Sequence, residues 1–316
     1  MRALAGRAAT NMPSSEIPHL PLVPAHVQRQ FTRRGDLADA QFFYGEIARR
    51  MDERLRYIRL DPQAMLDAGC GAGDALPLLQ ARYPQAAYTG LDHNAALLAH
   101  AQRRFRPDGP MAWLKRLAPR KAAITFQAGD LAQTGLAPES QDLVWSNLAL
   151  HWHPTPHAAL AEWRRVLKVG GLAMFSWLGP DTLRELRQAV AAAGLQTATP
   201  QFVDMHDFGD LLVENGYADP VMDQEIITLT YRDPERLLKD VWALGGNASA
   251  GRRAALSTRH WRQRLIDALD AQRGADGLIV LSMEVAYGHA WRAASHRSAP
   301  GETRLSVNAI QRKPPQ

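Results

Sequence analysis

The chain lacks the features that define several protein classes. Its 316 residues include a single cysteine, Cys70, so no disulfide can form within the chain. No apolar run approaches the roughly 18 residues that a membrane span needs. No internal repeat or low-complexity tract is evident. The sequence therefore predicts a globular protein without a membrane span, in a reducing compartment, which we expect to be the cytoplasm.

An excess of charge and a metal-ligand pattern are also missing. The 37 Lys and Arg residues exceed the 32 Asp and Glu residues by only five. Such a balance allows an acidic partner without requiring one. Two basic stretches, 103–121 and 252–264, are candidates for docking an acidic protein or a nucleic acid. The histidines around His151 and His206 have no recognised ligand spacing, so no metal is predicted.

The most informative segment is a glycine-rich turn after a short apolar run. Residues 65–73 read M-L-D-A-G-C-G-A-G, so Asp67 precedes glycines at positions 69, 71 and 73. Glycines at this spacing let the chain turn sharply out of a strand and bring backbone N–H groups close to a ligand. The small Cys70 suits the crowded turn better than a role as a reactive thiol. We expect Gly69, Gly71 and Gly73 to lie at a ligand site.

A second apolar run, Ala87–Leu91, ends in Asp92 and His93. Asp92 lies roughly 20 residues beyond the glycines, where a carboxylate can accept hydrogen bonds from ribose hydroxyls. The turn does not read G-x-G-x-x-G, and no G-K-[ST] follows for phosphates. The pattern therefore favours a nucleoside ligand other than a dinucleotide, and a Rossmann domain for another nucleotide is the alternative.

Alternating strand and helix patterns from Met65 to Ser176 predict parallel βαβ units in an open, doubly wound α/β sheet. The ligand should then lie beyond the carboxyl ends of the strands. Residues 126–131 are expected to contain the turn after a third strand, and 142–152 a fourth strand and its loop. A helix over 158–168 should end at Gly170 and Gly171. The sequence thus predicts one nucleoside-binding domain with its site at these strand ends.

These segments, in this order, resemble the motifs of class I S-adenosylmethionine (AdoMet) methyltransferases, which have a Rossmann-like fold. The resemblance implies that Asp67 lies near the cationic methionine end of AdoMet. It places Asp130 at the adenine amino group and the backbone N–H of Leu131 against the ring. Asn147 would lie beside the cofactor. Together with the three glycines, Asp92 and His93, these residues form the expected AdoMet site.

Catalytic candidates are fewer, because methyl transfer is an in-line displacement that depends mainly on alignment and desolvation. His151, after the fourth strand, is expected near the acceptor as a base or hydrogen-bond donor. Its alternative role is to anchor the loop through a backbone hydrogen bond. Trp152 is either a pocket wall or core. Tyr44, in the helical region before the glycine turn, is a weak active-site candidate.

A more specific resemblance covers most of the chain. Segments 145–152, 181–186, 202–207 and 287–291 are similar to the malonyl-acyl-carrier-protein O-methyltransferases of biotin synthesis. The resemblance implies methylation of the free carboxylate of a malonyl thioester, with malonyl-acyl-carrier protein as the partner. A carboxylate is already ionised at neutral pH, so no general base is required. An arginine of the cap, with Arg184 as one guess, would hold it.

Several alternatives remain open. The complex I assembly factors share this type of fold and loop, and His151 instead of Gln leans toward that branch, one member of which is regarded as an arginine hydroxylase. Another small-molecule methyltransferase and an AdoMet-binding protein without turnover are further possibilities. A nucleic-acid substrate is not expected, because Ser146–Ala149 stands where base methyltransferases carry an Asn/Asp-Pro-Pro-aromatic loop. The oligomeric state is left open.

We expect a disordered tail over residues 1–27 and a methyltransferase domain over 28–316. Within this domain the AdoMet-binding core covers about 61–180. N-terminal helices over 27–60 precede it, and a helical substrate cap covers about 181–275. The C-terminal strands lie within 278–312, in two runs, 278–291 and 303–310, joined by a hairpin loop, and the final strand should be antiparallel.

Overall fold

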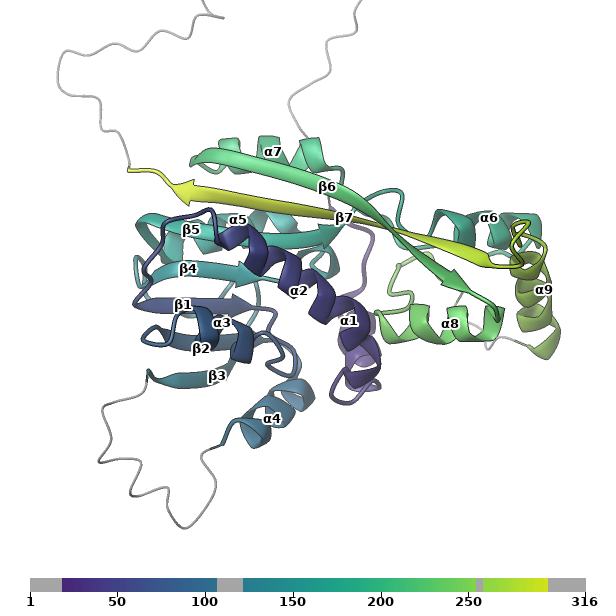
Figure 1. Cartoon of the computed structure of the whole chain (residues 1–316), viewed down its shortest axis with the longest axis horizontal. Helices are drawn as coiled ribbons and strands as arrows, with labels where there is room; N and C mark the ends of the chain where they lie inside the picture. Colours follow the sequence, from purple (N-terminus) through teal and green to yellow (C-terminus); the bar gives the residue numbers. More distant parts are fainter. Residues whose placement is uncertain (1–18, 107–121, 254–257, 295–316) are drawn as a thin grey trace, which may run out of the picture.

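The computed structural model describes residues 19–106, 122–253 and 258–294, and it contains a seven-stranded mixed sheet (Figure 1). The strand order is β3-β2-β1-β4-β5-β7-β6. β1 to β5 run parallel, whereas β7 lies antiparallel between β5 and β6. The strands are β1 (Ala64–Ala68), β2 (Ala87–Asp92), β3 (Ile124–Ala128), β4 (Gln141–Ser146), β5 (Leu167–Leu178), β6 (Tyr217–Tyr231) and β7 (Ile279–Arg292). The predicted Rossmann-like α/β fold is confirmed.

Helices cover both faces of the sheet because successive strand residues point to opposite sides. In β1, Met65 packs into the cluster under α2 and α3, and Leu66 packs into the cluster under α4, α5 and α7. A third group, α6, α8 and α9, lies at the far end of β6 and β7 (Figure 1). The helices are α1 (Pro24–Thr32), α2 (Gln41–Leu55), α3 (Leu76–Arg82), α4 (Ala95–Arg104), α5 (Pro156–Val166), α6 (Arg184–Ala192), α7 (Met205–Glu214), α8 (Pro234–Ala243) and α9 (Arg259–Asp270), with short 3₁₀ turns η1 (Ala38–Ala40) and η3 (Leu150–Trp152). Within the described ranges, none of these helices has the length and apolar character needed to cross a bilayer.

The predicted tail boundary at residue 27 is wrong for the described part of that segment. Leu20 and Leu22 are buried, Leu22 forms a β-bridge with Ser249, and α1 begins at Pro24. Proline suits the first turn of a helix, whose N–H groups have no intrahelical acceptors. The apolar side chains of this short segment therefore dock on the domain despite its prolines. Residues 1–18 lie outside the described residues.

The helical region over 27–60 is two helices, and the expected helix over 158–168 begins and ends two residues earlier than predicted. The break between α1 and α2 contains Gly35 and Leu37, both with positive φ. α5 ends at Val166, because Leu167 already pairs with Gln141 as the first residue of β5. Gly170 and Gly171 thus belong to a strand. The expected strand 303–310 and its hairpin loop lie outside the described residues, and β7 supplies an antiparallel strand next to β5.

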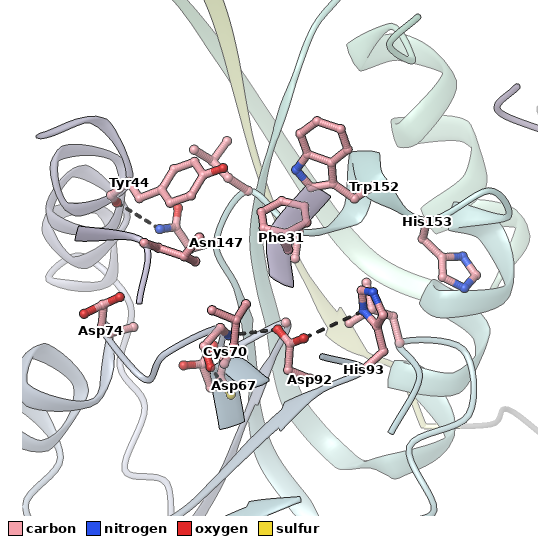
Figure 2. Close-up of a pocket in the computed structure, with 18 of the residues that line it drawn as sticks. Phe31, Tyr44, Asp67, Cys70, Asp74, Asp92, His93, Asn147, Trp152 and His153 are labelled. Carbon is pink, nitrogen blue, oxygen red and sulfur yellow. Dashed lines mark hydrogen bonds and ion pairs between the residues drawn. The ribbon is translucent and has the colours of Figure 1, made fainter. Parts of the chain in front are cut away.

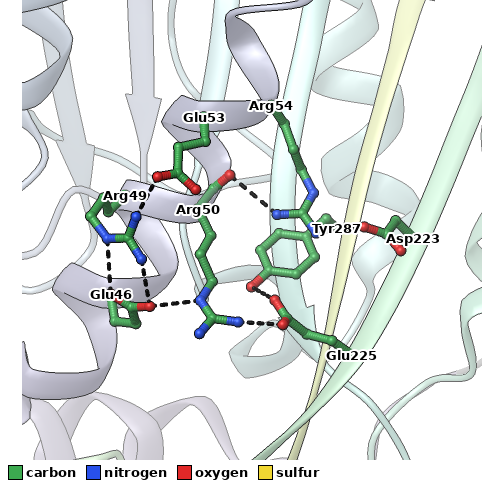
Figure 3. Close-up of polar contacts among 8 residues, drawn as sticks. All are labelled: Glu46, Arg49, Arg50, Glu53, Arg54, Asp223, Glu225 and Tyr287. Carbon is green, nitrogen blue, oxygen red and sulfur yellow. Dashed lines mark hydrogen bonds and ion pairs between the residues drawn. The ribbon is translucent and has the colours of Figure 1, made fainter.

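A polar network ties α2 to the edge of the sheet (Figure 3). Arg50 pairs with Glu46 on its own helix and with Glu225 on β6. Glu225 also accepts a hydrogen bond of 2.7 Å from the hydroxyl of Tyr287 on β7. Arg54 lies 3.7 Å from the centroid of the Tyr287 ring. Partly exposed pairs contribute little singly, but this network joins three elements far apart in the sequence.

Candidate active site

The glycine turn is shaped by contacts that leave no room for side chains. The N–H groups of Gly69 and Cys70 both donate to the carbonyl of Leu91, at 2.8 and 3.0 Å. Gly69 has a φ of 82°, and a Cβ there would lie 2.3 Å from the Cβ of Ala149. The turn is therefore held against the loop after β4, at the point where the strand order reverses between β1 and β4.

Asp92 connects the end of β2 to this turn. One carboxylate oxygen accepts from the N–H of Gly71 at 2.9 Å, and the other accepts from the N–H of Asn94 at 2.8 Å. The Nδ1 atom of His93 lies 3.7 Å from the carboxylate. Burial raises the pKa of Asp92, although these backbone hydrogen bonds oppose the rise. The carboxylate is held rigidly and still faces the cavity.

Asp67 lies at the end of β1, on the floor of the same cavity. Burial raises its pKa to about 7, against a hydrogen bond of 2.6 Å from the Tyr88 hydroxyl that favours ionisation. A buried carboxyl of this kind ionises more readily when a cation lies beside it. Cys70 also faces the cavity, but burial raises the pKa of its thiol well above the usual range, so the thiolate is disfavoured.

The cavity extends from this acidic floor to an aromatic end (Figure 2). At the aromatic end the Phe31 and Trp152 rings make an edge contact with centroids 5.4 Å apart. The Tyr44 hydroxyl donates to the carbonyl of Leu244 at 2.8 Å. Asn147 donates to the backbone carbonyl of Tyr44 at 2.9 Å and so connects the loop after β4 to α2. The cavity thus has a polar half and an aromatic half.

Most of the expected cofactor residues line this cavity. These are Asp67, Gly69, Gly71, Asp92, His93, Asp130, Leu131 and Asn147. Gly73, also expected there, is not among the lining residues; it has a φ of 78°, and a Cβ on it would lie 3.0 Å from the Phe105 ring and 3.1 Å from the Phe126 ring. Asp130 contacts Nε2 of His153 at 3.1 Å, and this hydrogen bond lowers the pKa of Asp130.

The expected position of His151 beside the acceptor is wrong. His151 is buried, does not line the cavity, and packs against the rings of Trp152 and Phe202. Its Nδ1 accepts a long hydrogen bond of 3.4 Å from the N–H of Leu178. Burial lowers its pKa to about 3, so the ring stays neutral and is a weak base. The alternative role, anchoring the loop, fits this geometry, whereas Tyr44 and Trp152 do face the cavity.

The expectation for the cap is also corrected. Within the described part of the cap segment 181–275, no residue lines the cavity. Arg184 pairs instead with Asp181 at 3.2 Å and Glu185 at 3.0 Å. The first helices form the upper wall, through α1 residues Val27 and Phe31. The cap reaches the site indirectly, through the Leu244 carbonyl that holds Tyr44 and through Gly245, whose backbone lies against the Trp152 ring.

Sequence reasoning missed part of the wall. Phe31, Gln41 and Asp74 also line the cavity, and none of them was predicted as a site residue. Gln41 donates to Asp74 at 2.7 Å, which connects the start of α2 to the glycine turn. Asp74 directly follows Gly73, so its place after the motif was the available signal. For Gln41 and Phe31 no local signal exists, because tertiary packing brings them there.

Comparisons with known proteins agree with this geometry. The family model described as "Methyltransferase domain" matches residues 66–175. The YcgJ protein of Bacillus subtilis superposes with a TM-score of 0.53 at 15% identity, covering 79% of this chain and 100% of that one. Phosphoethanolamine N-methyltransferase 2 of Haemonchus contortus gives a TM-score of 0.51 at 14% identity, covering 82% of this chain and 57% of that one. The fold is therefore that of the class I methyltransferases.

More similar sequences define the family. A malonyl-[acyl-carrier protein] O-methyltransferase of Laribacter hongkongensis is 46% identical over 273 residues, which cover 86% of this chain and 90% of that protein. Its namesake in Gallionella capsiferriformans is 39% identical over 277 residues, which cover 87% and 93%. The chain belongs to the malonyl-[acyl-carrier protein] O-methyltransferase family and is an enzyme of the methyltransferase class.

Proposed function

We propose that the protein transfers the methyl group of AdoMet to the free carboxylate of a malonyl thioester carried by acyl-carrier protein, as a step of biotin synthesis. The observation that carries this proposal is the two-part cavity, in which the acidic glycine turn faces an aromatic chamber. The names of the relatives supply the acceptor. The methyl ester masks a charge and so lets enzymes that elongate uncharged acyl chains accept the product.

In this proposal each part of AdoMet contacts a different set of lining residues. Asp92 accepts hydrogen bonds from the ribose hydroxyls, and Asp67 faces the cationic methionine end. Asp130 lies at the adenine amino group, and the backbone N–H of Leu131 faces the adenine ring. Asn147 holds the loop beside the cofactor through its contact with Tyr44. The positions of these groups along one cavity support the assignment.

In this reaction the main task of the protein is to align the two substrates. A carboxylate oxygen attacks the methyl carbon, the bond from carbon to sulfur breaks, and the electron pair stays on sulfur. No proton moves, because the carboxylate is ionised at neutral pH. The aromatic end, formed by buried Phe31 and half-buried Tyr44 and Trp152, limits contact with water and orients the acceptor. The weak basicity of His151 is compatible with a reaction that needs no base.

Two measurements test the proposal. Mass spectrometry of malonyl-acyl-carrier protein incubated with enzyme and AdoMet should show the gain of one CH₂ group. Calorimetry should show that Asp92→Asn weakens AdoMet binding by about 1.5–3 kcal/mol, through the loss of charge-assisted hydrogen bonds. Wild-type protein that binds AdoMet but forms no ester would favour the assembly-factor alternative over methylation.

The structure also helps to choose between the two basic stretches as the docking surface for the acyl-carrier protein. In the first stretch, Arg104 pairs with Asp74, and residues 107–121 lie outside the described residues. In the second, Arg262 pairs with Glu235 at 2.8 Å, but Arg253 and Arg259 are exposed and have no ion pair within the described residues. Arg252 donates to His26 on α1 at 3.1 Å. We therefore favour the second stretch, beside the helix that lines the cavity.

Charge reversal tests this surface. Replacing Arg252, Arg253 and Arg259 by Glu should raise KM for malonyl-acyl-carrier protein several-fold more than KM for malonyl-coenzyme A, because the protein partner is acidic. Salt should weaken the wild-type preference by screening. Arg103→Glu, on the exposed end of α4, tests the rival first stretch and should leave both KM values unchanged. Equal effects on both substrates would contradict docking at this surface.

A further inference from the structure

Arg34, just after α1, is half-buried, and one N–H group of its guanidinium has no acceptor. Its side chain lies between two rings, with its central carbon 5.5 Å from the centroid of Phe31 and 4.8 Å from that of Trp242. Nε donates to the carbonyl of Trp242, and Nη2 donates to the side chain of Gln30 at 3.3 Å. Nη1 is buried and has no hydrogen-bond partner among the described residues.

The charge of Arg34 is not balanced. No Asp or Glu of the described ranges forms an ion pair with Arg34, whereas Arg50 has two carboxylate partners. Burial lowers the pKa of Arg34 to about 10, so it remains protonated at neutral pH. A guanidinium whose buried N–H group has no acceptor is less stable than one whose N–H groups are all paired, and a bound anion would supply the missing acceptor. Arginine, with its planar fork of donors, suits a carboxylate in particular.

Contacts place this cation directly behind the aromatic end of the cavity. Phe31, which packs on Arg34, also lines the cavity and packs on Trp152 (Figure 2). The chain after α8 passes close to both: a Cβ at Gly245 would lie 2.0 Å from the Trp152 ring, and one at Gly246 would lie 2.9 Å from Nη2 of Arg34. Two successive glycines thus let the cap backbone close over the guanidinium and the aromatic wall.

We propose that Arg34 binds the free carboxylate of the acceptor and selects a charged acyl thioester over an uncharged one. This inference rests on the proposed function, and it assigns to α1 the role that the sequence suggested for Arg184 in the cap. The acceptor enters at the aromatic end, and a displacement of the Phe31 ring exposes Nη1 to it. The carboxylate then satisfies the donor that the free protein leaves without a partner.

The direction of the kinetic effect follows from the reaction. The carboxylate loses its negative charge as the bond from oxygen to the methyl carbon forms, so Arg34 stabilises the bound substrate more than the transition state. Such an interaction lowers KM and does not raise kcat. The ester product no longer pairs with the guanidinium, which favours its release. Arg34 is therefore a specificity-determining residue.

The test uses Arg34→Met, which keeps the apolar stem but removes the charge, with malonyl-coenzyme A as the probe and AdoMet saturating. We expect KM to rise about 10- to 100-fold, as the loss of a charged hydrogen bond implies, and kcat to change less than about threefold. Arg34→Lys should restore part of the loss. Arg33→Met is the matched control, because Arg33 is exposed and its side chain makes no hydrogen bond or ion pair with any residue the structure describes.

A second readout separates charge recognition from a structural role. Inhibition by succinyl-coenzyme A, which is charged, should exceed inhibition by uncharged acetoacetyl-coenzyme A in the wild type, and Arg34→Met should abolish the preference. AdoMet affinity, measured by calorimetry, should stay unchanged. A variant that retains the preference, or that loses AdoMet binding equally, would overturn the inference. If the wild type prefers charged thioesters yet forms no ester, the proposed function fails and the anion site stands.

Discussion

The two halves of the cavity are built in different ways. The acidic floor comes from one continuous stretch, in which β1, the glycine turn and β2 place Asp67, Gly69 and Asp92 together. The aromatic end is assembled from α1, α2 and the loop after β4, with Leu244 of the cap behind it. The floor therefore depends on local backbone geometry, whereas the aromatic end depends on how distant elements pack.

Two arginines of the N-terminal helices extend this comparison. Arg50 shares its charge with Glu46 and Glu225 in a network that fixes α2 to the sheet (Figure 3). Arg34 has ring faces and one backbone carbonyl around it but no carboxylate among the described residues. A satisfied arginine of this kind is explained by structure alone. A half-buried arginine with one buried N–H group and no carboxylate partner is better explained by a ligand that binds there.

The largest effect is expected from a substitution at Gly69, in the acidic floor of the cavity. Gly69→Ala should lower the free energy of unfolding by about 1–2 kcal/mol through its positive φ and by a further 1–3 kcal/mol or so through the collision with Ala149. Gly170→Ala is the control, since Gly170 has a φ of 77° and nothing within 4 Å of the added Cβ. Only Gly69→Ala should weaken AdoMet binding in calorimetry; equal weakening in both would contradict the role of the turn.

The next effect concerns pH at Asp67. Because burial raises its pKa to about 7, the free protein holds Asp67 largely protonated below that pH. Cationic AdoMet favours the ionised form, so its affinity should rise up to about tenfold between pH 6 and pH 8. The raised pKa also means that the contribution of Asp67 to folding is complete below its unfolded pKa and is lost as pH rises through 7. Asp67→Asn should remove this part of both pH dependences; an identical binding profile in the variant would refute the assignment.

A smaller effect should appear at the aromatic end. Tyr44→Phe removes the hydrogen bond to Leu244, so KM for malonyl-coenzyme A should rise about fivefold, which corresponds to roughly 1 kcal/mol. AdoMet affinity should stay within about twofold. Tyr217→Phe is the matched control, because it also removes a buried hydroxyl donor at 2.8 Å from a carbonyl, far from the cavity. Both variants should lose similar stability, and a matching rise of KM in both would show that Tyr44 acts through folding alone.

The smallest effect on catalysis is expected at His151. Because its pKa is lowered to about 3, His151→Gln should leave the pH profile of kcat between about pH 6 and pH 8 unchanged. The neutral ring contributes stability above its unfolded pKa of about 6.5, and this contribution is lost as pH falls toward 3. Denaturant unfolding should therefore show a shallower acid dependence in the variant. A shifted kcat profile would restore His151 as a catalytic group.

Local rules predicted much of the fold and the cofactor side of the site. The strand and helix periods predicted the parallel part of the sheet, the glycine spacing placed Asp67 and Asp92 on one edge, and the family resemblance added Asp130. Segment ends were less predictable: α5 stops at Val166 because Leu167 finds a strand partner in Gln141, which no local pattern reveals. The burial of Leu20 and Leu22 likewise depends on a partner more than 200 residues away.

What the sequence by itself determined is the sheet, the glycine turn and the acids around it, because these depend on neighbours within a few tens of residues. The tertiary structure alone decided that His151 turns into the core and that Arg184 pairs with Asp181 and Glu185. It also decided that α1 forms a wall of the aromatic end of the cavity. Burial and ion pairing depend on every element that packs around a side chain. The environment of Arg34, set by α1 and α8 together, is the clearest case of that dependence.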